Sequence, residues 1–114
     1  MSTITPLSDL QMLEAAIAES SERPVLLFKH SRTCGISWEA LDELQVHLER
    51  RTQPDATYKM ITVQSHRSVS EEAAARLGVR HETPQAILLR HGRPVWKASH
   101  FRITADELNR ALEY

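Results

Sequence analysis

Residues 25–41 read VLLFKHSRTCGISWEAL and contain the only cysteine of the 114-residue chain. The apolar run Val25–Phe28 shows no polar alternation, which is typical of a central strand that is covered on both faces. From Ile36 onward the apolar residues recur with helical spacing. The sequence therefore predicts a strand over Val25–His30 and a helix that ends near Arg51, with Cys34 at the junction between them.

A lone cysteine at a strand-to-helix junction has two interpretations. Thr33 is the expected N-cap of the helix, which would place Cys34 in the first turn. Backbone N–H groups are unpaired there and the helix dipole adds partial positive charge, so this position favours the thiolate, which is the reactive form of cysteine. The alternative is that Cys34 is a small, buried apolar residue.

The rest of the chain alternates between helical and strand patterns. Apolar spacing and capping residues predict further helices over Ser8–Ser20, Ser68–Leu77, ended by Gly78, and Thr104–Leu112. Strands are expected over Tyr58–Val63, Ala86–Leu89 and Pro94–Ala98, and Met1–Pro6 is either a short edge strand or an ordered tail. Turns are expected at Gln53-Pro54-Asp55 and at His91-Gly92.

This order of elements, (β)-α-β-α-β-α-β-β-α, determines the expected fold class. Alternating strands and helices produce parallel strand pairs with helices on both faces of the sheet. The His91-Gly92 loop is too short for a crossover, so the last two strands should form an antiparallel hairpin. The sequence thus predicts an α/β three-layer sandwich with a mixed central sheet and a C-terminal hairpin plus helix. Sites in such sheets lie at the carboxyl ends of strands, where Cys34 falls.

Composition narrows the range of functions. The length predicts a single domain over residues 1–114. A formal net charge of −1 predicts no nucleic-acid partner. Apolar runs of only about four or five residues predict no membrane span. Neither observation determines the oligomeric state. The absence of a charged-then-apolar leader, together with a free thiol, predicts a cytoplasmic protein. Four histidines lack metal-ligand spacing, so no metal site is expected: His47, His66, His81 and His91.

Ser37 lies three residues after Cys34, where dithiol exchange enzymes carry a second cysteine. A hydroxyl cannot attack a disulfide, so an external thiol must clear any mixed disulfide that forms on Cys34. This excludes an autonomous dithiol reductase and fits the removal of a small thiol from a modified protein. Ser37 is either a hydrogen-bond donor to the thiolate or an ordinary helix residue.

The chain resembles a known family in several segments. A cysteine after the first central strand and a Thr83-Pro84 pair before the last hairpin resemble the thioredoxin fold. The local sequence is similar to the YtxJ-type monothiol bacilliredoxins, whose usual motif is Thr-Cys-Pro-Ile-Ser. The resemblance covers about Leu7 to Leu112 and is carried by these residues: Phe28-Lys29-His30-Ser31, Thr33-Cys34, Ile36-Ser37, Thr83-Pro84-Gln85, Gly92, Val95-Trp96, Ser99-His100 and Ile103-Thr104.

The resemblance implies a monothiol thiol–disulfide oxidoreductase with Cys34 as its nucleophile. It implies that Pro84 is a cis-proline opposite the cysteine, and that Thr83 and Pro84 shape the substrate groove. It also implies that the small thiol is bacillithiol, a co-substrate rather than a bound cofactor, and that the partners are S-bacillithiolated proteins. Gly35 departs from the family, which usually has proline there, so its extra N–H and looser backbone are expected to alter reactivity.

Further residues near Cys34 are candidates for substrate binding, together with Thr33 and Gly35. His30 either acts on the thiol, as an imidazolium or as a neutral proton shuttle, or is a buried strand histidine. The malate group of bacillithiol would suit a basic surface, for which Lys29, Arg32 and His100 are the candidates, although such side chains are usually only solvated. Two alternatives to the oxidoreductase are a non-catalytic binding or redox-sensing module modified at Cys34 and a thiol peroxidase.

Overall fold

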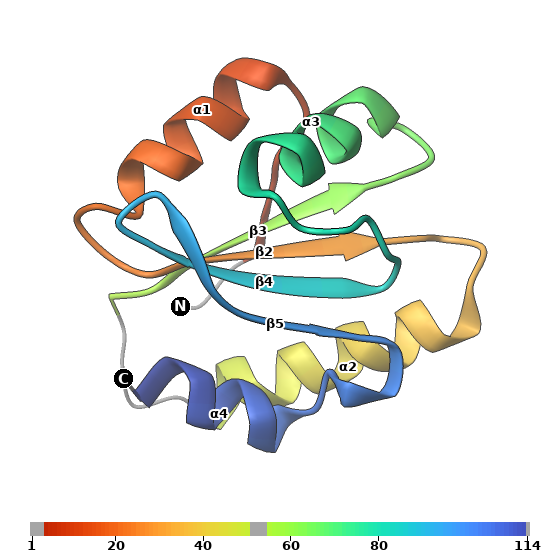
Figure 1. The fold of residues 1–114 in the computed structure, drawn as a ribbon. Helices are drawn as coiled ribbons and strands as arrows, with labels where there is room; N and C mark the ends of the chain where they lie inside the picture. Colours follow the sequence, from red (N-terminus) through yellow and green to blue (C-terminus); the bar gives the residue numbers. More distant parts are fainter. Residues whose placement is uncertain (1–3, 51–54, 114) are drawn as a thin grey trace.

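The computed structural model describes residues 4–50 and 55–113, in which helices cover both faces of a five-stranded sheet (Figure 1). The elements in chain order are β1 (Ile4–Pro6), α1 (Leu10–Glu19), β2 (Val25–His30), α2 (Gly35–Arg50), β3 (Thr57–Thr62), α3 (Arg67–Leu77), β4 (Gln85–Arg90), β5 (Arg93–Ser99), the 3₁₀ turn η1 (His100–Arg102) and α4 (Ala105–Glu113). Met1–Thr3, the expected end of α2 at Arg51 and the Gln53-Pro54 part of the expected turn lie outside the described residues.

The strand order is β1-β3-β2-β4-β5, which confirms the mixed sheet. Strands β1 and β2 run parallel to β3, while β4 is antiparallel to both β2 and β5. Every residue of β2 is buried, as its unbroken apolar run predicts for a central strand. The final hairpin and helix also form as expected, so the α/β sandwich architecture is confirmed.

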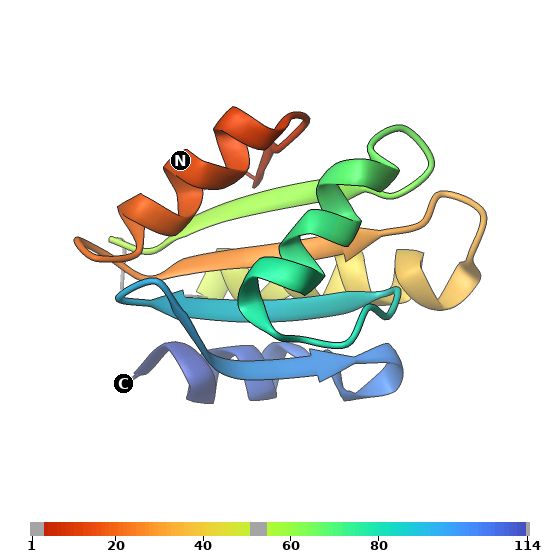
Figure 2. The same cartoon turned by 45° about the horizontal axis from the view of Figure 1, so that its top comes forward.

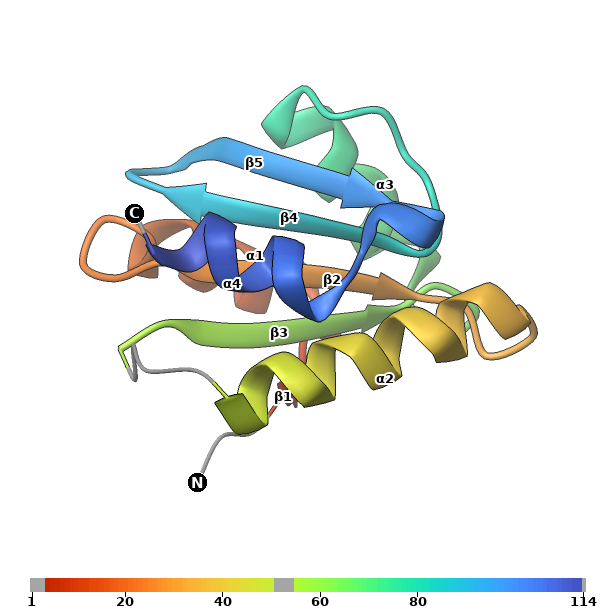
Figure 3. The ribbon, with the colours of Figure 1, turned by 90° about the horizontal axis from the view of Figure 1, so that it is seen from below.

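Two apolar cores lie on opposite faces of the sheet. Val25 and Leu27 point into the core beneath α1 and α3, whereas Leu26 and Phe28 point into the core beneath α2 and α4. Figure 2 shows α1 and α3 crossing one face of the sheet, and Figure 3 shows α2 and α4 on the other. No helix within residues 4–50 and 55–113 is long and apolar enough to cross a bilayer.

The β4–β5 hairpin turns through His91 and Gly92, whose φ angles are 54° and 75°. Two successive positive φ angles define the type I′ turn that suits the twist of a two-residue hairpin. Ser20, which follows α1, holds the turn: its carbonyl accepts from His91 N at 2.7 Å and its Oγ from Gly92 N at 2.8 Å. The tip of the hairpin is thereby fastened to the end of a helix far away in sequence.

The helix caps depart from the sequence prediction at two places. Asp9, not Ser8, caps α1, because α1 begins at Leu10 and Asp9 Oδ1 accepts from Met12 N at 2.7 Å. Helix α3 begins at Arg67 rather than Ser68, and His66 precedes it without a side-chain cap. Gly78 ends α3 with φ 64°, as predicted.

Helix α4 is capped as its sequence predicts and also by a distant residue. Thr104 Oγ1 accepts from Glu107 N at 3.1 Å, which confirms this cap. Glu43 from α2 adds a second acceptor, because its Oε1 accepts from Ala105 N at 2.8 Å. The two helices on this face are therefore joined by a polar contact as well as by the apolar core.

Candidate active site

The candidate site lies at the end of the sheet where strand β2 finishes and its neighbour β4 begins. Lys29 near the end of β2 pairs with Gln85 at the start of β4, and Gln85 pairs with Ser99 at the end of β5. This register brings the loop that carries Cys34 and the loop that carries Pro84 to the same edge. The expected location at a strand carboxyl end is thus found in the tertiary structure.

Cys34 occupies the N-cap position of α2. Its carbonyl accepts from Ser37 N at 3.1 Å and from Trp38 N at 3.3 Å, which are the first bonds of the helix. Thr33 was the predicted N-cap, and this prediction is wrong because the helical bonds begin one residue later. Cys34 is partly exposed, which argues against its interpretation as a buried apolar residue.

The first turn of α2 has amides available to an anion. The N–H groups of Gly35 and Ile36 donate to no acceptor within the part of the chain that the structure describes. The side chain of an N-cap residue reaches the amide of the second helical residue, here Ile36, and the helix dipole adds partial positive charge. Both effects stabilise negative charge at this position.

Gln64 holds the cysteine loop in place, a role that the sequence analysis missed. Its Nε2 donates to Ser31 Oγ at 2.7 Å and to Thr33 Oγ1 at 3.2 Å, and its Oε1 accepts from Arg32 N at 3.1 Å. Its position in the sequence could have indicated this role, because Gln64 follows β3, the parallel neighbour of β2. Carboxyl ends of neighbouring parallel strands meet at one edge.

Ser37 and His30 form a buried polar pair beneath the loop. His30 Nδ1 lies 2.7 Å from Ser37 Oγ, which also accepts from Ser31 N at 3.0 Å. His30 is only 2% exposed, and its Nε2 has no partner among the described residues. Burial lowers the pKa of His30 below its usual value, and the nearby Arg32 charge lowers it further. His30 is therefore neutral near pH 7, which disfavours the imidazolium interpretation.

This pair constrains what Ser37 can do for the thiolate. A serine hydroxyl has one proton, and it is used when Ser37 donates to His30 Nδ1. The proton is available to Cys34 only when His30 carries its own proton on Nδ1 and donates to Ser37 Oγ. Among the described residues, the contacts of Ser37 Oγ are with His30 and Ser31, and the structure shows no hydrogen bond from Ser37 Oγ to Cys34.

Replacing Ser37 with alanine is expected to lower the free energy of unfolding by about 1–3 kcal/mol. The change leaves His30 Nδ1 and Ser31 N without their shared partner in a buried place. Urea denaturation of both proteins measures the loss. Ser65→Ala is the matched control because Ser65 is exposed, and an unchanged midpoint for Ser37→Ala would contradict the assigned contacts.

Gly35 has open space where a side chain would begin, at the position where the family that the sequence resembles usually has proline. A Cβ at Gly35 would meet no heavy atom within 4 Å. We expect Gly35→Pro to raise the unfolding free energy by about 0.5–1 kcal/mol, because it restricts the unfolded chain at a helical position that suits proline. It should leave the rate of alkylation of Cys34 by iodoacetamide at pH 7 unchanged, because an N-cap side chain reaches the second and third amides of its helix rather than the first. Slower alkylation of Gly35→Pro, but not of Gly35→Ala, which keeps the N–H, would contradict this and assign a donor role to Gly35 N–H.

Trp38 and Arg32 lie at the rim of the site. Trp38 Nε1 donates to the Arg32 carbonyl at 2.9 Å, and its ring meets His30 edge-on at 4.5 Å between centroids. The Arg32 guanidinium is exposed and donates to Ser65 Oγ at 3.3 Å. Arg32 is therefore positioned to meet an anionic group that approaches from solvent.

The peptide bond between Thr83 and Pro84 is cis. Pro84 is buried and its carbonyl accepts from His100 N at 3.1 Å, while Thr83 is partly exposed. His100 Nδ1 lies 3.9 Å from Glu82 Oε1, so a carboxylate already neighbours this imidazole. Thr83, Pro84 and His100 are thus brought to the site edge as expected.

Lys29 does not contribute charge to the surface of the site. Its side chain is fully buried, and its Nζ donates to the Ser70 carbonyl at 2.9 Å and lies 3.2 Å from His81 Nδ1. Burial lowers the pKa of Lys29 to about 8. The suggested role of Lys29 in binding an acidic thiol is therefore wrong, because the side chain points into the sheet–α3 interface.

Among the described residues, no three His, Cys, Asp or Glu side chains gather as a metal site requires.

The chain matches one protein family and several solved structures. Residues 5–108 match the family described as Monothiol bacilliredoxin BrxC. A solved structure described as a candidate oxidoreductase with a thioredoxin fold is 34% identical, with a TM-score of 0.83 over 95% of this chain and 92% of that one. Thioredoxin from Fasciola hepatica is 14% identical with a TM-score of 0.76 over 96% and 97% of the two chains. A mutant thioredoxin from Halobacterium salinarum is 22% identical with a TM-score of 0.71 over 99% and 92%.

The last two likenesses show the shared fold, and the family match extends over most of the sequence, including the whole cysteine loop and the cis-proline loop. The chain has one cysteine, which agrees with a monothiol family. This chain belongs to the monothiol bacilliredoxin family and is a thiol oxidoreductase with a thioredoxin fold.

Proposed function

We propose that this protein removes a low-molecular-weight thiol, bacillithiol, from mixed disulfides on proteins. The observation that carries the proposal is the placement of a single, partly exposed cysteine at the N-cap of α2, with Ser37 in place of a resolving cysteine. The family match supports the monothiol chemistry. A free thiol of this kind suits a reducing compartment, and we propose that the protein acts in the cytoplasm.

The proposed reaction has two exchange steps. The Cys34 thiolate attacks the bacillithiol sulfur of the mixed disulfide, which forms a Cys34–bacillithiol disulfide and releases the substrate cysteine as a thiolate that takes up a proton. A second bacillithiol thiolate then attacks this disulfide, which releases oxidised bacillithiol and restores the Cys34 thiolate. Over the two steps, one protein mixed disulfide and one free bacillithiol are consumed, and one protein thiol and one oxidised bacillithiol are formed, so the free bacillithiol is the reductant.

The surrounding residues have separate roles in this proposal. The first-turn amides of α2 stabilise the thiolate, and the buried Ser37–His30 pair holds the base of the loop. In this proposal, the substrate contacts Thr33, Gly35, Thr83 and Pro84. The exposed Arg32 guanidinium is suited to the carboxylates of the malate group of bacillithiol, because charge-assisted contacts from arginine match carboxylate geometry.

Mass-resolved turnover of a bacillithiolated model protein tests the proposal. The protein is added with excess bacillithiol, and the expected result is loss of the modification with a transient adduct on Cys34. If Cys34 becomes modified but never passes the thiol on, the catalytic proposal is wrong and the protein is a redox-sensing module. A glutathionylated copy of the same substrate, assayed with glutathione, is the control, and equal turnover would contradict the choice of bacillithiol.

A further inference from the structure

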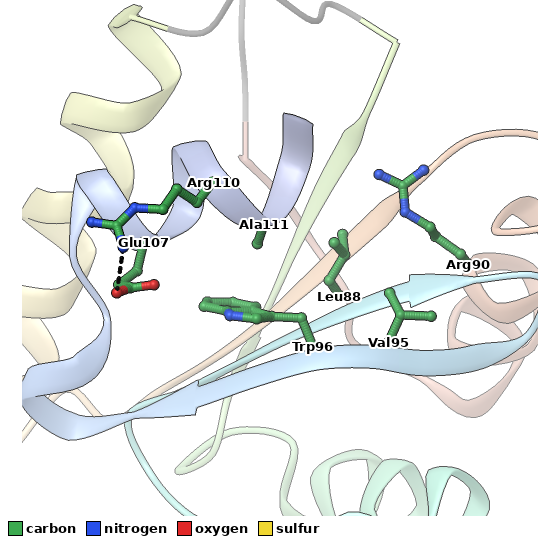
Figure 4. Close-up of a pocket in the computed structure, with 7 residues that line it drawn as sticks. All are labelled: Leu88, Arg90, Val95, Trp96, Glu107, Arg110 and Ala111. Atoms are coloured by element: carbon green, nitrogen blue, oxygen red, sulfur yellow. Dashed lines mark hydrogen bonds and ion pairs between the residues drawn. The ribbon is translucent and has the colours of Figure 1, made fainter. Parts of the chain in front are cut away.

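A basic and apolar depression lies between strand β5 and helix α4, away from the cysteine loop. It has a volume of about 420 Å³. Figure 4 shows Arg90 and Arg110 on its two sides, with the Trp96 indole between them. Leu88 and Ala111 complete an apolar floor.

This depression continues toward the candidate active site. A second hollow of about 520 Å³ shares Trp96 and Glu107 with the first and adds Lys97, Phe101 and Arg102. A third, of about 340 Å³, shares Phe101 and reaches Ile36, two residues after Cys34. We call the first two hollows together the β5–α4 seam.

The seam has an excess of positive charge, whereas the charges of the whole chain are nearly balanced. Among the described residues that line it are four basic side chains, Arg90, Lys97, Arg102 and Arg110, but a single carboxylate, that of Glu107. The whole chain has 14 basic and 15 acidic residues. The third hollow is acidic instead, with Glu39, Asp42 and Glu43 in its lining. The positive charge is therefore concentrated at a distance from the cysteine.

The seam also exposes large apolar side chains. Val95 is 54% exposed and Phe101 is 70% exposed. Aromatic and arginine side chains around an apolar floor are the composition of the centre of a protein–protein interface. Strand β5 is the edge of the sheet, but Pro94 and the charged Arg93 and Lys97 discourage addition of another strand. A partner should therefore bind by inserting side chains into the seam, rather than by pairing its backbone with β5.

We propose that the β5–α4 seam binds an acidic segment, with apolar anchors, of the protein whose mixed disulfide Cys34 attacks. This inference rests on the proposed function and names a feature of its protein substrates. The segment would pair its carboxylates with Arg90 and Arg110 and place an apolar side chain on Trp96. The acidic third hollow requires that the segment be separated from the modified cysteine by a neutral stretch.

The test compares two peptides that carry the same bacillithiol mixed disulfide. Each has a neutral linker of about ten residues, which spans roughly 33 Å when extended, the longest dimension of the molecule. One ends in a segment of glutamates and leucines, and the other has glutamines in place of the glutamates. We expect kcat/KM to be about tenfold higher for the acidic peptide at low ionic strength and the advantage to shrink with added salt.

Two double variants test whether the seam arginines cause the higher kcat/KM of the acidic peptide. Arg90→Glu with Arg110→Glu should abolish the advantage of the acidic peptide and leave turnover of the glutamine peptide unchanged. Arg50→Glu with Arg76→Glu is the matched control, because it changes the net charge equally at exposed positions outside the seam. The proposal is wrong if the acidic peptide has no advantage or if the advantage survives in the Arg90/Arg110 variant.

A binding measurement separates failure of the seam from failure of the proposed function. The unmodified acidic peptide should shift the Trp96 indole N–H signal in the nuclear magnetic resonance spectrum, which Trp38→Phe assigns. If neither modified peptide is turned over but the shift occurs and is lost in the Arg90/Arg110 variant, the seam is supported and the proposed function is wrong. A shift caused by duplex DNA and not by the peptide would overturn the seam proposal.

Discussion

Replacing Cys34 with serine is expected to reduce removal of the small thiol from a protein mixed disulfide to the uncatalysed background. A serine hydroxyl is a poor nucleophile toward sulfur and cannot form the mixed disulfide through which exchange proceeds. The chain has no second cysteine that could replace it. Intact-mass measurement of the substrate and of the protein over time shows both the rate and any adduct.

The control for this variant is its stability. Cys34 Sγ makes no hydrogen bond within the described part of the chain, and the residue is partly exposed. Its replacement should therefore change the unfolding free energy by no more than about 0.5 kcal/mol. If Cys34→Ser remains folded and still removes the thiol above background, the assignment of Cys34 as nucleophile is wrong.

Replacing Lys29 with methionine is expected to change how stability depends on pH. Burial lowers the pKa of Lys29 from 10.5 to about 8, because its ammonium group has no carboxylate partner in the contacts described. Between these two values the unfolded chain binds more protons than the folded chain, so stability rises with pH. A shift of this size corresponds to roughly 3 kcal/mol.

The expected measurement is therefore a difference between two proteins. Below pH 8 the buried ammonium costs the wild-type protein its full penalty, and from pH 8 to 10.5 this penalty disappears as Lys29 loses its proton. The unfolding free energy of the wild-type protein should thus gain up to roughly 3 kcal/mol relative to Lys29→Met over that interval. Urea denaturation at a series of pH values gives both curves.

A surface variant controls for other groups that titrate in the same interval. Lys59 lies on the neighbouring strand β3 and is partly exposed, so Lys59→Met removes a lysine that keeps contact with water. Parallel curves for the wild-type protein and Lys29→Met would show that Lys29 is not a buried ammonium in the folded protein. The contacts assigned to Ser70 and His81 would then be wrong.

Local sequence patterns predicted the elements of this fold well. The unbroken apolar run before Lys29 gave a central strand, the helical spacing after Cys34 gave α2, and the Thr104–Glu107 pair gave the cap of α4. Gly78 ended α3 in the left-handed conformation as expected. These features depend on residues close together in the chain, and so a local pattern contains the information that specifies them.

The contacts around the cysteine were less predictable. The sequence placed His30 and Ser37 near Cys34 but did not show that they bond to each other, and it gave no role to Gln64. It also offered Lys29 as a surface charge, whereas strand alternation turns its side chain to the face under α3. Each of these contacts joins residues that lie on different elements or on opposite sides of a loop, so a local sequence pattern does not specify it.

The sequence by itself thus determined the order of strands and helices, the presence of a single cysteine and the serine that stands three residues after it. The tertiary structure decided which side chains meet at the sheet edge, because the register of β2 with β3 and β4 fixes which residues lie side by side. It also decided where charge gathers, since Arg90 from β4 and Arg110 from α4 line the same hollow only when α4 packs against the β4–β5 hairpin. Spacing along the chain specifies an element, but only packing between elements specifies a surface.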